Sequence, residues 1–111
     1  GNTTAFANSV ADILERLVRE GKIGKKVAMV NVADAFGIEL AEAARPIFKK
    51  HGLEIVYDKS YPLGTQDLAP LVKGAKAANP DAFVAWSYPP DSFALAELSK
   101  IENLNVKAYY S

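Results

Sequence analysis

The alternation of helix-type and strand-type patterns limits what this chain of 111 residues can fold into. Apolar residues recur at helical spacing in four segments, and a short β-rich run follows each of them. The helical segments are about 4–20, 36–50, 67–78 and 90–102, and the β-rich runs are Lys26–Val32, Leu53–Tyr61, Ala82–Tyr88 and Val106–Tyr110. Because a helix can return the chain to the same edge of a sheet, the pattern predicts parallel strands flanked by helices.

The predicted fold class is α/β, a three-layer sandwich with a mainly parallel sheet and helices on both faces. Right-handed crossovers put the first strand beside both the second and the third, which gives the strand order 2-1-3-4. Ligands of such sheets bind at the carboxyl ends of the strands, near the point where the strand order reverses. We therefore expect the loops Ala33–Gly37 and Ser87–Asp91 to face a ligand.

Residue types at the segment ends predict where the helices begin and end. Thr3 or Thr4 is expected to cap the first helix and Gly21 to end it. The third helix is expected to begin at Thr65 or Asp67. Pro46 lies inside the second helical pattern, where proline costs about 3 kcal/mol or more, so a kink or a local break is expected there.

The second β-rich run differs from the first and third because its apolar residues are interrupted by polar ones. Simple alternation puts Ile55 and Tyr57 on one side of this strand and Val56 and Asp58 on the other. The run is therefore predicted to be less buried than Lys26–Val32, which is apolar enough for a strand that is covered on both faces.

Composition excludes several classes of function. Thirteen basic residues balance thirteen acidic ones, which argues against a nucleic-acid-binding tract or a polybasic membrane patch. There is no cysteine, and the single histidine, His51, is expected to be solvated at a helix end, so no metal site is predicted. The carboxylates are scattered and Ser87 has no plausible base, so no catalytic site and no cofactor are predicted.

Four short motifs occur in the order and spacing of a known family. They are Lys25–Val30 with Asp34-Ala35-Phe36-Gly37, Tyr61–Asp67, Asn79–Ala82, and Ser87-Tyr88. On these segments the chain resembles type I periplasmic solute-binding proteins of ABC importers, in particular the leucine/isoleucine/valine-binding branch, over nearly its whole length.

The resemblance implies a receptor without enzymatic activity. Members of this family have two lobes and bind a small solute in the cleft between them. Residues 1–111 resemble one α/β lobe, and we interpret them as a truncated part of the carboxy-terminal lobe. The implied solute is a branched or aromatic amino acid or an aromatic carboxylate. The implied partner of the full-length protein is an ABC permease, and the implied location is periplasmic or extracellular, including a cell-surface lipoprotein.

Two aromatic residues are the main candidates for contact with a solute. Phe36 follows the first strand, and the family places an aromatic residue against the ligand here. It either caps the core or forms an apolar wall of the site. Tyr88 follows the third strand and is either an exposed loop residue or a ring that grips an amphipathic solute.

Three further candidates have structural explanations as well. Ser87 offers a hydroxyl donor. Asp34 is either a ligand-binding carboxylate or the cap of the second helix, and the cap is the favoured interpretation. Gly37 either allows a close backbone approach to the solute or serves a tight turn.

Two other classes of protein share this pattern. A flavodoxin-like or response-regulator module has the same topology, but a phospho-acceptor domain needs an aspartate where this chain has Ser87. The effector-binding domain of a transcriptional regulator or of an extracellular receptor has the same two-lobe plan. The last strand, Val106–Tyr110, is expected to leave an open edge through which the chain forms a homodimer or exchanges elements.

Overall fold

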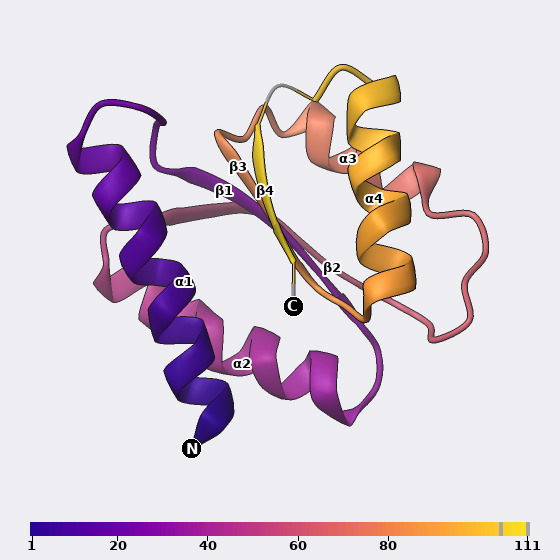
Figure 1. Cartoon of the computed structure of the whole chain (residues 1–111), viewed down its shortest axis with the longest axis horizontal. Coiled ribbons are helices and arrows are strands. Elements are labelled where there is room, and N and C mark those ends of the chain that lie inside the picture. Colours follow the sequence, from indigo (N-terminus) through magenta and orange to yellow (C-terminus); the bar gives the residue numbers. More distant parts are fainter. Residues whose placement is uncertain (105, 111) are drawn as a thin grey trace.

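The computed structural model describes residues 1–104 and 106–110, and these residues form one parallel sheet covered by helices (Figure 1). The strands pair in the order β2-β1-β3-β4, and all three pairings are parallel. The elements are α1 (Asn2–Arg19), β1 (Lys26–Val32), α2 (Ala35–Lys50), β2 (Glu54–Tyr61), α3 (Ala69–Ala77), β3 (Ala82–Trp86), α4 (Pro89–Ile101) and β4 (Lys107–Tyr110). The predicted fold class and strand order are confirmed.

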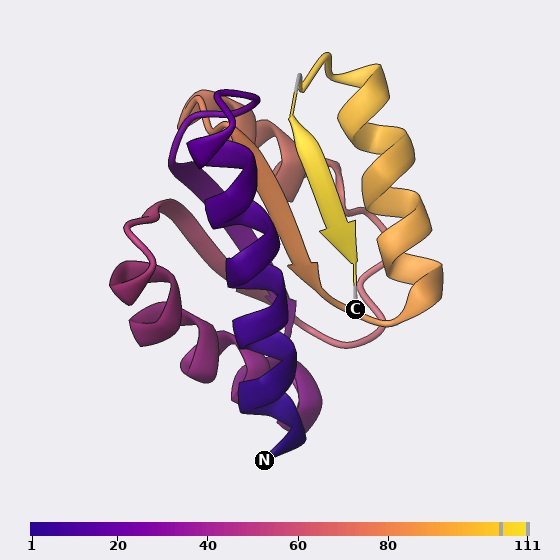
Figure 2. The same cartoon turned by 60° about the vertical axis from the view of Figure 1, so that its left-hand side comes forward.

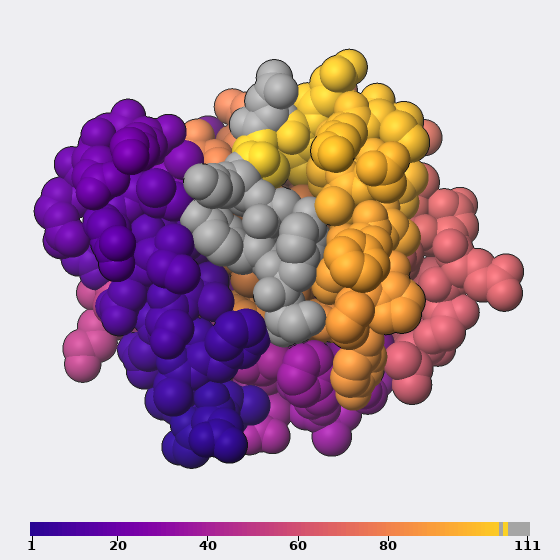
Figure 3. All heavy atoms as spheres, in the orientation of Figure 1, coloured from indigo at the N-terminus to yellow at the C-terminus, as the bar shows by residue number. Residues whose placement is uncertain are grey.

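Two helices cover each face of the sheet. Helices α1 and α2 pack on one face and α3 and α4 on the other, as the two views in Figures 1 and 2 show. In the space-filling view of Figure 3, α1 forms one flank of the visible face and α4 the other. The layers bury two apolar clusters, one around Trp86 and Phe48 under α1 and α2, the other around Phe83 and Leu95 under α3 and α4.

Strand β1 lies at the centre because its sequence is almost continuously apolar. Six of its seven residues are buried, and successive residues point into opposite clusters. Val27 and Met29 contact the cluster under α1 and α2, whereas Ala28 and Val30 contact the cluster under α3 and α4.

The predicted alternation in β2 is wrong because the strand contains a bulge. Val27 pairs with Ile55 and Ala28 pairs with Tyr57, so Val56 is an extra residue in the ladder. Ile55 consequently packs under α1 and α2, while Tyr57 packs under α3 and α4. A shift of one residue exchanges the faces of every later side chain, so Asp58 lies on the same face as Ile55.

The first helix begins two or three residues earlier than its threonines predicted. Its N-cap is Gly1, which supplies no side-chain cap, and Thr3 donates instead to Glu39 Oε1 on α2 over 2.7 Å. The predicted capping role of Thr3 or Thr4 is therefore wrong. Gly21 follows the end of the helix with φ of 73°, as expected of a residue that ends a helix.

Prolines mark two helices whose predicted form or start can be compared with the structure. Helix α2 runs through Pro46 as one continuous helix, so the local break, one of the two expected outcomes, does not occur. Helix α3 begins later than predicted, with Leu68 at its N-cap, and Asp67 Oδ1 accepts the backbone N–H of Ala69 over 3.1 Å. Pro70 lies in the first turn of α3, where the missing N–H costs nothing.

Candidate functional site

The carboxyl ends of β1 and β3 bring two aromatic rings into contact. Phe36, in the first turn of α2, and Tyr88, the N-cap residue of α4, stack with ring centroids 4.9 Å apart and an interplanar angle of 23°. The Tyr88 side chain is exposed and Phe36 is half-buried. The two loops predicted to face a ligand therefore meet at one rim of the sheet, which we call the aromatic rim: Asp34, Phe36, Gly37, Ser87 and Tyr88.

Asp34 connects the two loops of the aromatic rim by hydrogen bonds. Its Oδ1 accepts the backbone N–H of Gly37 over 2.9 Å, which caps α2, and its Oδ2 accepts the Tyr88 hydroxyl over 2.6 Å. The Gly37 N–H and then the Tyr88 hydroxyl stabilise the carboxylate and lower the pKa of Asp34. Donation to Asp34 in turn raises the pKa of the Tyr88 hydroxyl.

Gly37 fits tightly against the preceding strand. A Cβ atom at this position would lie 2.0 Å from the carbonyl oxygen of Val32, a distance that no real side chain tolerates. Gly37 is buried, so its close approach is made to β1 and allows α2 to start directly beside the strand.

A second polar network at the same end of the sheet was missed by sequence reasoning. Tyr61, the last residue of β2, has its hydroxyl 2.7 Å from Ser87 Oγ and 2.8 Å from Asp91 Oδ2. A carboxylate only accepts, so the single Tyr61 proton goes to Asp91 and the phenol oxygen accepts from Ser87. Burial is the main cause that raises the pKa of Tyr61. An aromatic residue at a strand's carboxyl end, followed by Pro62, is the signal that could have indicated this residue.

The structure separates Ser87 from the other candidates. Its side chain is fully buried and bonded to Tyr61, so its hydroxyl points into the protein at the rim. Asp91 lies in the first turn of α4, where its Oδ2 accepts from Tyr61, and α4 has no side-chain cap at Tyr88.

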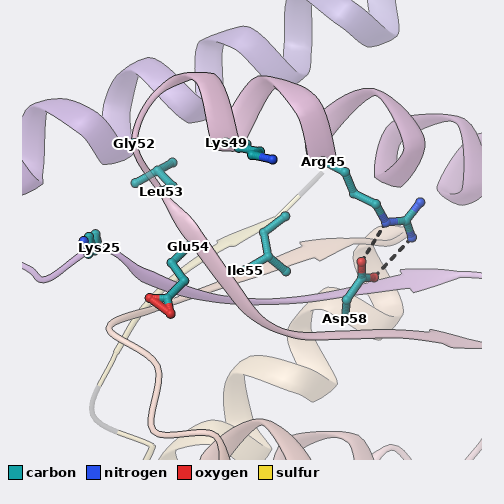
Figure 4. A pocket seen from close by; sticks show the side chains of 8 residues that line it. All are labelled: Lys25, Arg45, Lys49, Gly52, Leu53, Glu54, Ile55 and Asp58. Carbon is teal, nitrogen blue, oxygen red and sulfur yellow. Dashed lines mark hydrogen bonds and ion pairs between the residues drawn. The ribbon is translucent and has the colours of Figure 1, made fainter.

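The described part of the chain is hollowed beside the aromatic rim and at the edge of the sheet. The smaller hollow, of about 290 Å³, adjoins the aromatic rim and is lined by Phe6, Phe36 and Leu40 together with Asn2 and Thr3. The larger one, of about 670 Å³, lies between α2 and the edge strand β2 (Figure 4). We call it the edge pocket; its lining includes Lys25, Arg45, Lys49, Leu53, Ile55 and Asp58.

The prediction of a solvated His51 is wrong. The His51 side chain, at the end of α2, is 19 % exposed, and its Nδ1 contacts Glu15 and lies 3.6 Å from Asp12 on α1. Among residues 1–104 and 106–110, these three side chains are the one group whose metal-ligating atoms converge, all within 4.8 Å of one another. The histidine therefore links α1 to α2 through the two carboxylates.

The aromatic rim combines an apolar stack with hydroxyl and carboxylate groups. The Tyr88 hydroxyl and the Asp34 carboxylate are already bonded to one another. Within the described residues, no helix has the length and apolar character needed to cross a membrane. The fold is that of the parallel α/β class, whose members bind ligands at the carboxyl ends of their strands.

Comparison with known proteins identifies the family. The family model described as periplasmic binding protein matches residues 2–105. The chain is 30 % identical over 92 residues to the Leu/Ile/Val-binding protein homolog 7 of Brucella suis, a match that covers 78 % of this chain and 23 % of that protein. The chain belongs to the periplasmic binding protein family, as its motifs predicted.

Solved structures show the same fold. A leucine-, isoleucine-, valine-, threonine- and alanine-binding protein of Brucella ovis, in a closed conformation, superposes with a TM-score of 0.80 at 21 % identity, over 90 % of this chain and 26 % of that one. A branched-chain amino acid ABC transporter periplasmic ligand-binding protein of Burkholderia xenovorans gives 0.80 at 20 % identity, over 95 % and 28 %.

Family membership has three consequences. Proteins of this family bind solutes and are not enzymes, and the family implies a periplasmic location. The chain spans about a quarter of the length of the relatives it matches. The flavodoxin-like and response-regulator alternatives are wrong, because the family match covers nearly the whole chain.

Proposed function

We propose that residues 1–111 form part of one lobe of a two-lobed receptor, which captures a small amphipathic solute and delivers it to an ABC importer. The similarity to proteins named for Leu/Ile/Val binding and for branched-chain amino acid transport supports this proposal. So does the coverage of about a quarter of those proteins, which leaves room in them for a second lobe. The solute would be a branched or aromatic amino acid or an aromatic carboxylate.

The stacked pair of Phe36 and Tyr88 is the observation that carries the proposal. It presents apolar surface at the carboxyl ends of the parallel strands, where ligands of such sheets bind. The hollow beside Phe36 adds apolar wall from Phe6 and Leu40. An aliphatic or aromatic solute side chain would pack against this wall, and closure of the second lobe would exclude water from the contact.

The charges of the rim determine which end of an amino acid it favours. Asp34 in the aromatic rim and Asp91 beside it supply two carboxylates, and none of the residues of the rim is cationic. Carboxylates attract an ammonium group and repel a second carboxylate. The ammonium end of the solute would therefore lie near this lobe, and its carboxylate would be bound by the other lobe.

The test is a two-dimensional NMR titration of the chain with L-leucine, L-phenylalanine and phenylacetate. We expect saturable shifts of the amides of Phe36, Gly37 and Tyr88. The dissociation constants should be in the millimolar range (about 4 kcal/mol of binding free energy), because this chain supplies one wall of the proposed site and the second lobe would supply the other. Phe36→Ala should abolish these shifts, whereas Phe93→Ala, which changes an exposed ring on α4, should leave them unchanged. Shifts at the rim with glucose or adenosine but with none of the three solutes would contradict the proposed ligand class.

The effector-binding domain of a transcriptional regulator, or of an extracellular receptor, would use the same rim. Permease genes beside the gene for this protein favour the importer, whereas a DNA-binding segment in the same polypeptide favours the regulator. Cell fractionation separates a free periplasmic protein from a lipid-anchored surface form.

We also propose that the chain self-associates through β4. Strand β4 pairs with β3 on one side and is the last strand of the described sheet, so its other side offers backbone groups for pairing. Sedimentation velocity over a wide range of protein concentration should detect a dimer that grows with concentration. A single monomeric species at the highest concentration would refute this proposal.

A further inference from the structure

The edge pocket lies away from the aromatic rim. Lys25 and Leu53 mark its position at the amino ends of β1 and β2, whereas Asp34 and Tyr88 follow the carboxyl ends of β1 and β3. Within the described sheet β2 is an edge strand, and the side of β2 that faces away from β1 is open to the pocket. Its volume of about 670 Å³ is in the range of small-molecule sites.

The floor of the pocket is apolar. Leu53 and Ile55 belong to the cluster under α1 and α2, and Ile55 is only partly buried there. Figure 4 shows the Ile55 side chain pointing from β2 toward α2, in the middle of the pocket. A ligand that covers Ile55 would remove apolar surface from water, at about 25 cal/mol for each Å².

The lining of the edge pocket has an excess of unpaired positive charge. Arg45 is neutralised by Asp58, with Nε 2.7 Å from Oδ2 and Nη2 3.2 Å from Oδ1. The hydrogen bond to Asp58 is the largest cause of the raised pKa of Arg45. Lys49 lies one turn further along α2 on the same face. Within residues 1–104 and 106–110, neither Lys49 nor Lys25 has a carboxylate within ion-pair distance.

Glu54, the other acidic residue that lines the edge pocket, does not pair with Lys25 or Lys49. Glu54 points from β2 away from α2 in Figure 4, opposite to Ile55. The two ammonium groups are therefore available to an anion that enters above the apolar floor. The bulge at Val56 contributes to this arrangement. It brings Asp58 to the same face of β2 as Ile55, and Asp58 forms its ion pair with Arg45 there.

We propose that the edge pocket binds a small organic monocarboxylate with an aliphatic or aromatic tail. The carboxylate pairs with Lys49, assisted by Lys25, and the tail covers Ile55 and Leu53. A bound carboxylate bridges α2 and the edge of the sheet, so it stabilises the contact between them. This site is independent of the solute site proposed at the aromatic rim.

The test is an NMR titration of the full chain with hexanoate, using hexan-1-ol and acetate as matched probes. Hexan-1-ol has the tail without the charge, and acetate has the charge with almost no tail. Hexanoate should shift the amides of Leu53 and Ile55 saturably, and should bind more tightly than either matched probe. Added salt should weaken its binding, because the lysines are exposed.

Substitutions separate this site from non-specific binding. Lys49→Gln should weaken hexanoate binding about two- to fivefold, the range expected for one exposed ion pair. Lys50→Gln, the neighbouring lysine that does not line the pocket, should leave it unchanged. Equal binding of hexanoate and hexan-1-ol, an equal loss in both variants, or no shift at Leu53 and Ile55 would overturn the proposal. Because the amides of Phe36 and Tyr88 report the aromatic rim, failure of either proposed site is visible independently of the other.

Discussion

At the scale of single residues, the contact between Gly37 and the Val32 carbonyl should control how α2 meets β1. Gly37→Ala inserts a methyl group 2.0 Å from a backbone oxygen, so the start of α2 must move. We expect a loss of about 1–3 kcal/mol in the free energy of unfolding, measured with urea. Gly74→Ala is the control, because its methyl group would meet the ring end of Tyr57, a side chain that can rotate away. Equal losses in the two variants would contradict this explanation.

Asp34 should make stability depend on pH in a defined direction. Its pKa is lowered in the folded protein, chiefly by the Gly37 N–H. The contribution of Asp34 is therefore complete above the unfolded pKa of about 3.9, and it is lost as the pH falls through the lower folded pKa. Asp34→Ala should lower the thermal midpoint at pH 7, and the difference from the wild type should shrink below pH 4. A difference from the wild type that is constant down to pH 2 would refute the assignment.

Local sequence predicted some of the candidate site and missed the rest for a physical reason. Phe36, Tyr88 and the capping role of Asp34 follow from strand ends and N-cap preference, which are local properties. Tyr61 and His51 are far in sequence from their partners Asp91 and Glu15, and only the packed fold brings these pairs together. Local sequence patterns do not reveal contacts between residues that are far apart in the chain.

At the scale of elements, Pro46 weakens a helix that nevertheless forms without a break. Helix α2 is fixed by buried residues on both sides of the proline, including Ala44 and Phe48, so packing outweighs the missing hydrogen bond. Pro46→Ala should raise the free energy of unfolding by about 2 kcal/mol. Removing a helix-interior proline gains ~3 kcal/mol, and the greater freedom of the unfolded chain without proline offsets up to about 1 kcal/mol of this gain. Chemical denaturation measures this gain.

The control for Pro46 is another proline in a helix. Pro70 lies in the first turn of α3, where no hydrogen bond is missing, so Pro70→Ala should give no gain. A gain of similar size at both positions would mean that the unfolded state, rather than α2, accounts for the effect.

The type and order of the elements could be predicted from hydrophobic spacing, but their local irregularities could not. The order β2-β1-β3-β4 follows from right-handed crossovers and the continuous apolar pattern of β1. The bulge at Val56 depends on how β2 pairs with β1. The residues of β2 would be the same with or without a bulge, so the strand sequence alone does not reveal it. At the start of α1, Thr3 bonds Glu39 on α2 instead of capping the helix, and a local capping pattern does not contain this contact.

At the scale of the whole molecule, the sheet separates two apolar clusters that should contribute independently to one cooperative unfolding transition. Val10→Ala changes the cluster under α1 and α2, and Val72→Ala changes the one under α3 and α4. Each should cost about 1.5–2.5 kcal/mol, from two lost methyl groups and the cavity left behind. The double variant should equal the sum within about 0.5 kcal/mol. Fluorescence of Trp86, the single tryptophan, and circular dichroism should give coincident transitions, and a coupling above 1 kcal/mol would contradict independence.

The extra residue at Val56 has a consequence for sequence change in this part of the chain. Deleting Val56 would remove the bulge and leave Ile55 opposite Val27 and Tyr57 opposite Ala28, as they are now. Neighbouring residues of a regular strand point to opposite faces, so both side chains would stay in their present clusters. Asp58 would also keep its face and its ion pair with Arg45. Homologous sequences should therefore vary freely in the identity of this residue and tolerate its loss.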